Sequence, residues 1–222
     1  MRRVTGRLPA AGGATGAVTT RRDGFVGSRW AYRGLQGLFR LYFCGWLRVR
    51  VEGMAQVPRE GPMILSGNHD SAWDPLLIST ILSDPVVHLT KIELFRSRPL
   101  AWALRHLGCI PVDRSRGDRR AIRQALEALA RGQALVIFPE GTRSGHEGRL
   151  GEFKQGTAFL ATRAGAVIQS FAICGRYRRG QLVVRFGACV HAQGEDRAAL
   201  TQWLSSAIAD AAAPPAGADP PA

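Results

Sequence analysis

Short apolar runs alternate with longer amphipathic stretches over most of the chain after residue 50. Six apolar runs predict buried strands, at Met63–Ser66, Val86–Thr90, Cys109–Val112, Ala134–Phe138, Val167–Ile173 and Leu182–Phe186. Five stretches predict helices, at Pro75–Leu82, Leu94–His106, Asp118–Arg131, Phe153–Ala164 and Glu195–Ala212. This alternation indicates an α/β domain over residues 51–212.

Both ends of the chain differ in composition from this domain. Residues 1–27 are rich in Gly, Ala, Thr and Arg with little apolar periodicity, so they predict a disordered basic arm. No uninterrupted apolar core follows the first arginines, which argues against a signal peptide. Residues 213–222, rich in Pro and Ala, predict a disordered tail.

Residues 28–50 predict an amphipathic helix. Its apolar side would carry Leu35, Leu38, Phe39, Tyr42 and Trp46, and its opposite side would carry Arg29, Arg33, Arg40 and Arg48. The apolar run is short and interrupted by Arg40, so a transmembrane span is disfavoured. A basic helix with aromatic side chains suits the surface of an anionic membrane, although an ordinary helix packed on the domain is the alternative.

The charge balance narrows the classes of partner. The net charge of +13 favours polyanions: nucleic acid, an anionic membrane or phosphorylated substrates. Ten arginines lie in the first fifty residues, and no helix-turn-helix or RNA-binding pattern is present, so we expect no nucleic-acid partner. The four cysteines are widely spaced and predict neither a zinc site nor a disulfide framework.

His69 and Asp74 form the first candidate site. They lie between the predicted strand Met63–Ser66 and the helix that Asp74-Pro75 would begin, with Asp74 as its N-cap. On one continuous helix the two side chains would diverge by about 140°, but across a turn they can meet. A carboxylate bound to one imidazole nitrogen leaves the other nitrogen to take up a proton. The alternative is a loop histidine beside a simple helix cap.

Further polar residues follow the other strands. Glu140, Gly141, Thr142 and Arg143 come directly after Ala134–Phe138, where α/β proteins often place ligand sites. Gly141 permits a tight turn, and an arginine there could bind phosphate oxygens in pairs.

Two other predicted strands end at cationic residues. Lys91 and Arg114 follow Val86–Thr90 and Cys109–Val112. If the strands are parallel, these ends converge with His69 and Asp74 on one crevice, which would suit a phosphorylated alcohol whose hydroxyl acts as nucleophile.

These motifs resemble those of the 1-acylglycerol-3-phosphate acyltransferase family. The sequence from Asn68 to Asp74 matches the family's His-x-x-x-x-Asp motif, and the sequence from Phe138 to Ser144 matches its Phe-Pro-Glu-Gly-Thr-Arg-Ser motif. The stretches at 108–114, 91–94 and 153–156 resemble three further family segments. The resemblance covers about residues 45 to 190 and implies a mixed β core flanked by helices, with an apolar tunnel for an acyl chain.

The resemblance also implies roles for the residues. His69 would be the general base, and Asp74 would orient it. Arg143, with Lys91 and Arg114, would bind the acceptor phosphate, while Glu140, Gly141 and Thr142 would belong to the phosphate-binding loop. The hydroxyl would attack acyl-CoA or acyl carrier protein directly, with no metal, no cofactor and no covalent enzyme intermediate. The expected location is the cytoplasmic face of the cell membrane, as a peripheral or monotopic protein.

One departure from the family pattern leaves the acceptor open. Ser170 stands where the family usually has a proline, in a segment that the resemblance associates with the acyl-chain or acceptor pocket. The acceptor could therefore be 1-acylglycerol-3-phosphate or another lysolipid: a lyso-ornithine lipid, another lysophospholipid or a glycolipid. A membrane-binding protein without enzymatic activity is a further alternative. A hydrolase is also conceivable, although no nucleophile elbow or metal cluster supports it.

Overall fold

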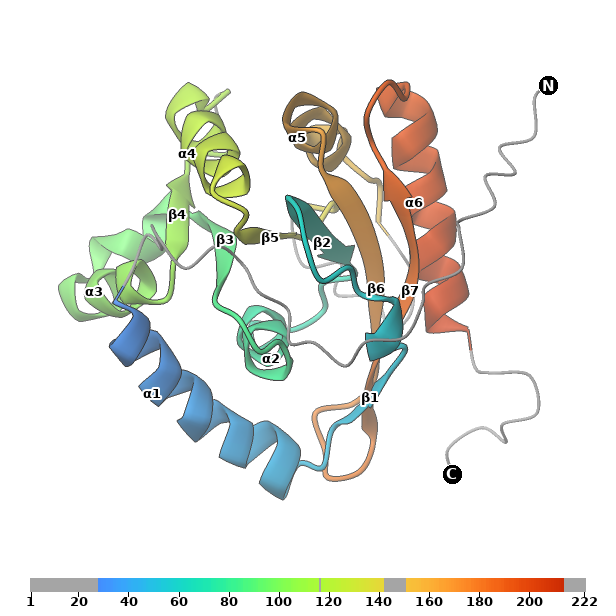
Figure 1. The fold of residues 1–222 in the computed structure, drawn as a ribbon. Helices are drawn as coiled ribbons and strands as arrows, with labels where there is room; N and C mark the ends of the chain where they lie inside the picture. Colours follow the sequence, from blue (N-terminus) through green and yellow to red (C-terminus); the bar gives the residue numbers. More distant parts are fainter. Residues whose placement is uncertain (1–27, 116, 142–150, 214–222) are drawn as a thin grey trace.

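A computed structural model describes residues 28–115, 117–141 and 151–213 as one seven-stranded sheet with helices on both faces (Figure 1). The predicted arm over 1–27, and the predicted tail beyond residue 213, lie outside these described residues.

All six predicted strands are present, and a seventh precedes them. The strands are β1 (Arg50–Glu52), β2 (Met63–Gly67), β3 (Val86–Lys91), β4 (Cys109–Val112), β5 (Ala134–Ile137), β6 (Val167–Gly175) and β7 (Leu182–His191). Their order in the sheet is β1-β7-β6-β2-β5-β3-β4. All neighbouring pairs are parallel except β6 and β7, so the predicted mixed sheet is confirmed.

The strands alternate their side chains between two cores. Ile64, Leu135 and Ile168 face a core that includes residues of α4 (Arg119–Ala130), α5 (Gly156–Ala164) and α6 (Arg197–Ala212). Leu65 and Val136 face the other core, which includes residues of α2 (Asp74–Ile81). Because both faces of the sheet are covered, its strands appear in the sequence as continuous apolar runs.

Two predicted helices begin three or more residues later in the structure than the sequence pattern suggests. At the predicted helix Leu94–His106, residues Ile92–Arg96 form a 3₁₀ segment, η3, and α3 (Arg98–His106) starts only after it, with Pro99 in its first turn. Proline is accepted in a first turn, where the missing N–H has no partner in the helix, but it is disfavoured inside a helix. The helix expected over Phe153–Ala164 begins at Gly156.

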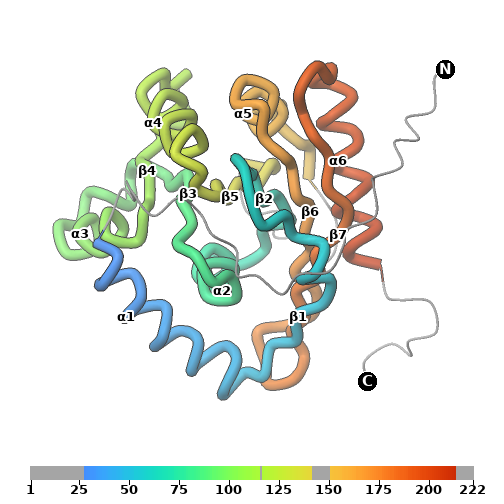
Figure 2. Tube along the Cα trace, viewed as in Figure 1, coloured from blue at the N-terminus to red at the C-terminus, as the bar shows by residue number. Residues whose placement is uncertain are grey.

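The predicted helix over residues 28–50 is shorter and partly different. An α-helix, α1 (Arg29–Arg40), continues as a π-helical segment, η1 (Leu41–Trp46), and Arg50 already belongs to β1 (Figures 1 and 2). Gln36 ties α1 to α2 through hydrogen bonds to the carbonyl oxygens of Ser79 and Leu82, at 2.8 and 2.7 Å.

The first two helical segments are packed on the domain and also expose apolar side chains. Tyr32 and Phe43 are buried, whereas Trp30, Leu41 and Trp46 are largely exposed. Within the described residues, no helix combines the length and apolar content needed to cross a membrane.

Candidate active site

Parallel pairing brings the carboxyl ends of the central strands to one edge of the sheet. The loops after β2 and β5 are adjacent there because these strands pair directly, and the turn after β6 lies on the other side of β2. The predicted convergence of strand ends is therefore present.

His69 and Asp74 meet across the turn between β2 and α2. The Nδ1 atom of His69 lies 2.9 Å from Oδ2 of Asp74. Asp74 is 1% exposed, whereas His69 is 16% exposed and lines a cavity. A buried carboxylate bound to Nδ1 fixes the orientation of the imidazole.

Asp74 does not act as the helix cap that its position before Pro75 suggested. The residue at the cap position is Trp73, with no capping bond from its side chain, and Asp74 is the first residue of α2. The Oδ2 atom of Asp74 instead accepts hydrogen bonds from the backbone N–H groups of Asp70 and Ser71, both at 2.8 Å. The carboxylate thus holds together the loop that carries His69.

A tyrosine from a distant turn completes the surroundings of Asp74. The phenol of Tyr177, in the turn between β6 and β7, donates a hydrogen bond to Oδ1 of Asp74 at 2.6 Å. Burial, and then the negative charge of Asp74, raise the pKa of Tyr177, so the phenol stays protonated and acts as a donor.

The motif residues beside the pair fix the backbone and ring of His69. Glu140, which is buried, accepts hydrogen bonds from the backbone N–H groups of His69 at 3.3 Å and Gly151 at 3.1 Å. The ring of Phe138 stacks on the imidazole with centroids 4.2 Å apart. Asn68 is bonded through its side chain to both the N–H and the C=O of Ile173 on β6, at 2.8 and 2.9 Å. The loop after β2 is thereby tied to both neighbouring strands.

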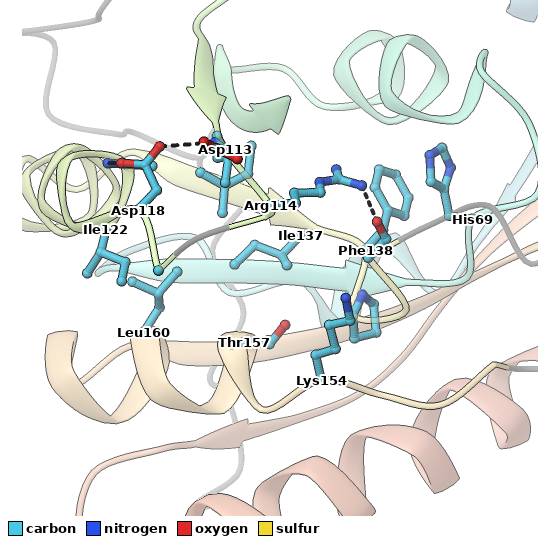
Figure 3. A pocket seen from close by; sticks show the side chains of 17 residues that line it. His69, Asp113, Arg114, Asp118, Ile122, Ile137, Phe138, Lys154, Thr157 and Leu160 are labelled. Carbon is cyan, nitrogen blue, oxygen red and sulfur yellow. Dashed lines mark hydrogen bonds between the residues drawn. The ribbon is translucent and has the colours of Figure 1, made fainter. Parts of the chain in front are cut away.

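The cavity beside His69 is lined by both charged and apolar residues. It encloses about 390 Å³. His69, Arg114 and Lys154 lie toward one end, and Ile122 and Leu160, from α4 and α5, lie at the other, beside Asp118 (Figure 3). The cations near His69 and the apolar side chains farther along suit a ligand with an anionic group and an alkyl chain.

Of the predicted cations, Arg114 reaches the cavity and Lys91 does not. Arg114 donates a hydrogen bond to the carbonyl oxygen of Gly141. Lys91 is 55% exposed and pairs with Glu93 at 3.5 Å, and it is not among the described residues that line the cavity. Lys154 is the lysine that lines it, and a Cβ placed on Gly141 would lie 3.2 Å from its Nζ atom.

Two of the predicted site residues, Thr142 and Arg143, lie outside the described residues.

Ser170 lies in the interior and not at the cavity. It is fully buried in β6, where its hydroxyl donates to the carbonyl oxygen of Ala188 on β7 at 2.8 Å. Ser170 is not among the described lining residues of the cavity, so the structure gives no contact through which it would select the acceptor there.

The sequence contained partial signals for the additional residues. Phe138 and Asn68 belong to the two strongest motifs, and Lys154 is one of only two lysines in the chain. Tyr177 has no such signal because its partner, Asp74, is 103 positions away and the contact depends on how β6 pairs with β2.

Comparison with known proteins places this site in a known family. Residues 48–174 match the acyltransferase family profile. The 1-acyl-sn-glycerol-3-phosphate acyltransferase of Pseudomonas aeruginosa is 30% identical over 183 residues, which are 74% of this chain and 70% of that protein. The lyso-ornithine lipid O-acyltransferase of the same organism is 38% identical over 138 residues, 61% of this chain and 51% of that protein.

A solved structure shows the same fold. The crystal structure of the 1-acyl-sn-glycerophosphate acyltransferase PlsC from Thermotoga maritima matches with a TM-score of 0.67 and 25% identity, over 81% of this chain and 77% of that one. The matched segment 48–174 holds the His69–Asp74 pair, Glu140 and the described residues that line the cavity. The chain is a member of the acyltransferase family, as the resemblance of its motifs implied.

Proposed function

We propose that the protein transfers a fatty acyl group to the sn-2 hydroxyl of 1-acylglycerol-3-phosphate and so makes phosphatidic acid. The acyl donor is a thioester, acyl-CoA or acyl carrier protein. The observation that carries this proposal is the contact between the buried Asp74 and His69, which lines a cavity together with two cations and apolar side chains. The names of the Pseudomonas and Thermotoga relatives support the same acceptor.

The chemistry follows from the orientation of the imidazole. With Nδ1 bonded to Asp74, Nε2 of His69 removes the proton of the acceptor hydroxyl as its oxygen attacks the thioester carbonyl. The tetrahedral adduct collapses, the carbon–sulfur bond breaks, and the imidazolium returns the proton to the departing thiolate. Asp74 stabilises the imidazolium between these steps. A positioned base contributes about 10² to 10⁴ to such a rate.

Cations that line the cavity near His69 would bind the acceptor phosphate. Arg114 and Lys154 both line the cavity beside His69. Arg143, which follows Gly141 closely in the sequence, joins them in this proposal, whereas Lys91 would require a rearrangement of its contact with Glu93. A guanidinium and an ammonium together suit a phosphate monoester, because both lower the cost of placing its charge beside an apolar pocket.

A second acceptor deserves a direct comparison. The relative named as a lyso-ornithine lipid O-acyltransferase has the higher identity of the two Pseudomonas proteins, although it is matched over a shorter length. A lyso-ornithine lipid carries no phosphate. The two acceptors therefore differ in the charge that they would place beside Arg114 and Lys154.

We further propose that the enzyme acts as a peripheral protein at the cytoplasmic face of a membrane. Large apolar side chains are exposed on three adjoining parts of the fold: α1 with η1, the loop between β2 and α2, and η3 with α3. These side chains are Trp30, Leu38, Leu41 and Trp46 in the first part, Trp73 in the second, and Ile92, Leu94, Leu100 and Trp102 in the third. Basic residues accompany them, including Arg40 and Arg98. Aromatic and basic side chains together favour an anionic lipid surface.

The test is thiol release from oleoyl-CoA by purified protein, with lysophosphatidic acid, lyso-ornithine lipid or no acceptor. Release that requires lysophosphatidic acid and disappears in His69→Ala would support the proposal. A strong preference for lyso-ornithine lipid would show that the acceptor is the second one and not lysophosphatidic acid. Release without any acceptor would indicate a thioesterase. If oleoyl-CoA gives no release, the same assay with oleoyl-acyl carrier protein decides, and inactivity with both donors would contradict the proposal.

A further inference from the structure

Both oxygens of the Asp74 carboxylate are occupied, but by groups of different origin. Oδ2 accepts from His69 and from two N–H groups of its own loop. Oδ1 accepts from Tyr177, at 2.6 Å. The three contacts on Oδ2 all lie within one loop, so they orient the carboxylate only relative to that loop. The contact with Tyr177 adds a restraint on the second oxygen from a different part of the fold.

The phenol is itself held by packing. Tyr177 follows the end of β6, whose pairing with β2 places this turn beside the loop that carries His69. Its ring packs edge-on against the ring of Phe43, with centroids 6.3 Å apart. Phe43, a residue of η1, is fully buried in the core, so the tyrosine side chain packs against a rigid support.

We propose that Tyr177 is a positioning residue for acyl transfer, which holds Asp74 in the orientation that keeps the imidazole of His69 aligned. This inference rests on the proposed function, because it assigns Tyr177 a part in the same proton transfer. Tyr177 acts through Asp74 and is not among the described residues that line the cavity.

The charged groups around the pair do not include the phenol of Tyr177, which is neutral and acts only through its hydrogen bond to Asp74. The charged groups are Asp70 on the same loop, Glu140 behind the His69 amide, and Arg114 and Lys154 at the cavity. A Tyr177→Phe substitution changes none of these charges.

The experiment measures kcat and KM of the full-length Tyr177→Phe protein with lysophosphatidic acid and oleoyl-CoA in detergent micelles. We expect kcat to fall roughly tenfold with KM changed less than about twofold, since the base is misaligned while substrate binding is kept. Arg179→Gln, an exposed residue in the same turn, is the matched control and should retain the original kcat and KM.

Each other outcome overturns the inference. An unchanged kcat, or a KM that rises as much as kcat falls, would each show that Tyr177 does not restrain Asp74. His69→Ala, assayed in parallel, separates this from failure of the proposed function. If the unmodified protein is inactive or His69→Ala remains active, acyl transfer by this pair is wrong. If those two behave as proposed and only Tyr177→Phe deviates, the positioning role alone is wrong.

Discussion

Glu140 accepts a hydrogen bond from the backbone N–H of His69, and this contact joins the two sequence motifs of the site. The same carboxylate accepts from Gly151, so one buried side chain connects the loop after β2 to the chain segment that precedes α5. Besides the phosphate binding proposed for it, the second motif therefore has a structural task, which is to hold the backbone of His69.

Removal of this carboxylate should damage both the site and the fold. In Glu140→Ala two N–H groups lose their acceptor, which costs about 1–3 kcal/mol of stability for each group that stays buried. We expect kcat to fall roughly 10- to 100-fold, because the His69 backbone is no longer fixed. Glu140→Gln retains a carbonyl acceptor and should lose less. Thiol-release kinetics and urea denaturation measure the two effects.

The control for this series is Glu152→Ala, which removes an exposed carboxylate near the same segment. It should leave kcat within about twofold, and the free energy of unfolding within about 0.5 kcal/mol, of the values for the unmodified protein, as is usual for surface substitutions. Equal kinetics for Glu140→Ala and the unmodified protein would show that the contact with His69 does not support catalysis.

The two lysines of the chain should behave differently. Lys154 lines the cavity, whereas Lys91 pairs with Glu93 at the surface. Lys154→Ala should raise the KM for lysophosphatidic acid roughly tenfold, about the free energy of one charge-assisted hydrogen bond. Lys91→Ala should change it less than about threefold. Acceptor saturation curves for the two variants decide, and a larger effect at Lys91 would restore its predicted role in phosphate binding.

Much of the fold followed from the sequence because burial on both faces makes the strands of this sheet uniformly apolar. β1 was missed because it has three residues and lies directly after a helical stretch. Helix beginnings were misplaced where apolar periodicity continued past the true start, as at α3 and α5. Local pattern gives the existence of an element more reliably than its ends.

The site was predictable where its contacts are local. His69 and Asp74 are five positions apart, so residue types and a turn were enough to bring them together. The contact of Tyr177 with Asp74 and the position of Lys154 in the cavity depend on strand order and register, which the residue pattern does not specify. For the same reason, Lys91 was grouped with the site although its side chain pairs with Glu93 at the surface.

The exposed aromatic residues allow a test of the membrane proposal. A double variant, Trp46→Ser with Trp102→Ser, removes two large exposed side chains from η1 and α3. Each is expected to contribute on the order of 1.5–3 kcal/mol if it is buried in lipid, so binding should fall at least 100-fold. Co-sedimentation with anionic vesicles at constant salt measures it.

Met54 provides the control for this test. It is an exposed apolar residue on η2 (Met54–Gln56), away from the three segments, and Met54→Ser should bind like the unmodified protein. Equal binding by the double variant would place the membrane contact elsewhere.

A buried histidine should make the fold sensitive to acid. His88 on β3 lies in the interior, 2.7 Å from the Ser79 hydroxyl through Nε2, and its Nδ1 has no hydrogen-bond partner among the described residues. Burial lowers the pKa of His88 to about 4, below the value of about 6.5 expected in the unfolded chain. The unfolded state therefore takes up a proton first as the pH falls, and stability is lost between about pH 6.5 and pH 4. From pH 7.5 to pH 5 this single group should remove about 2 kcal/mol.

Urea denaturation of the unmodified protein and of His88→Gln at both pH values isolates this contribution. The substitution costs stability at neutral pH through imperfect packing, but it should reduce the loss between pH 7.5 and pH 5, because glutamine does not titrate. His191→Gln, at an exposed position at the end of β7, should keep the full loss. If His88→Gln and the unmodified protein lose the same free energy, then His88 is protonated in the folded state at pH 5, which would require the core around Ser79 to open and admit water.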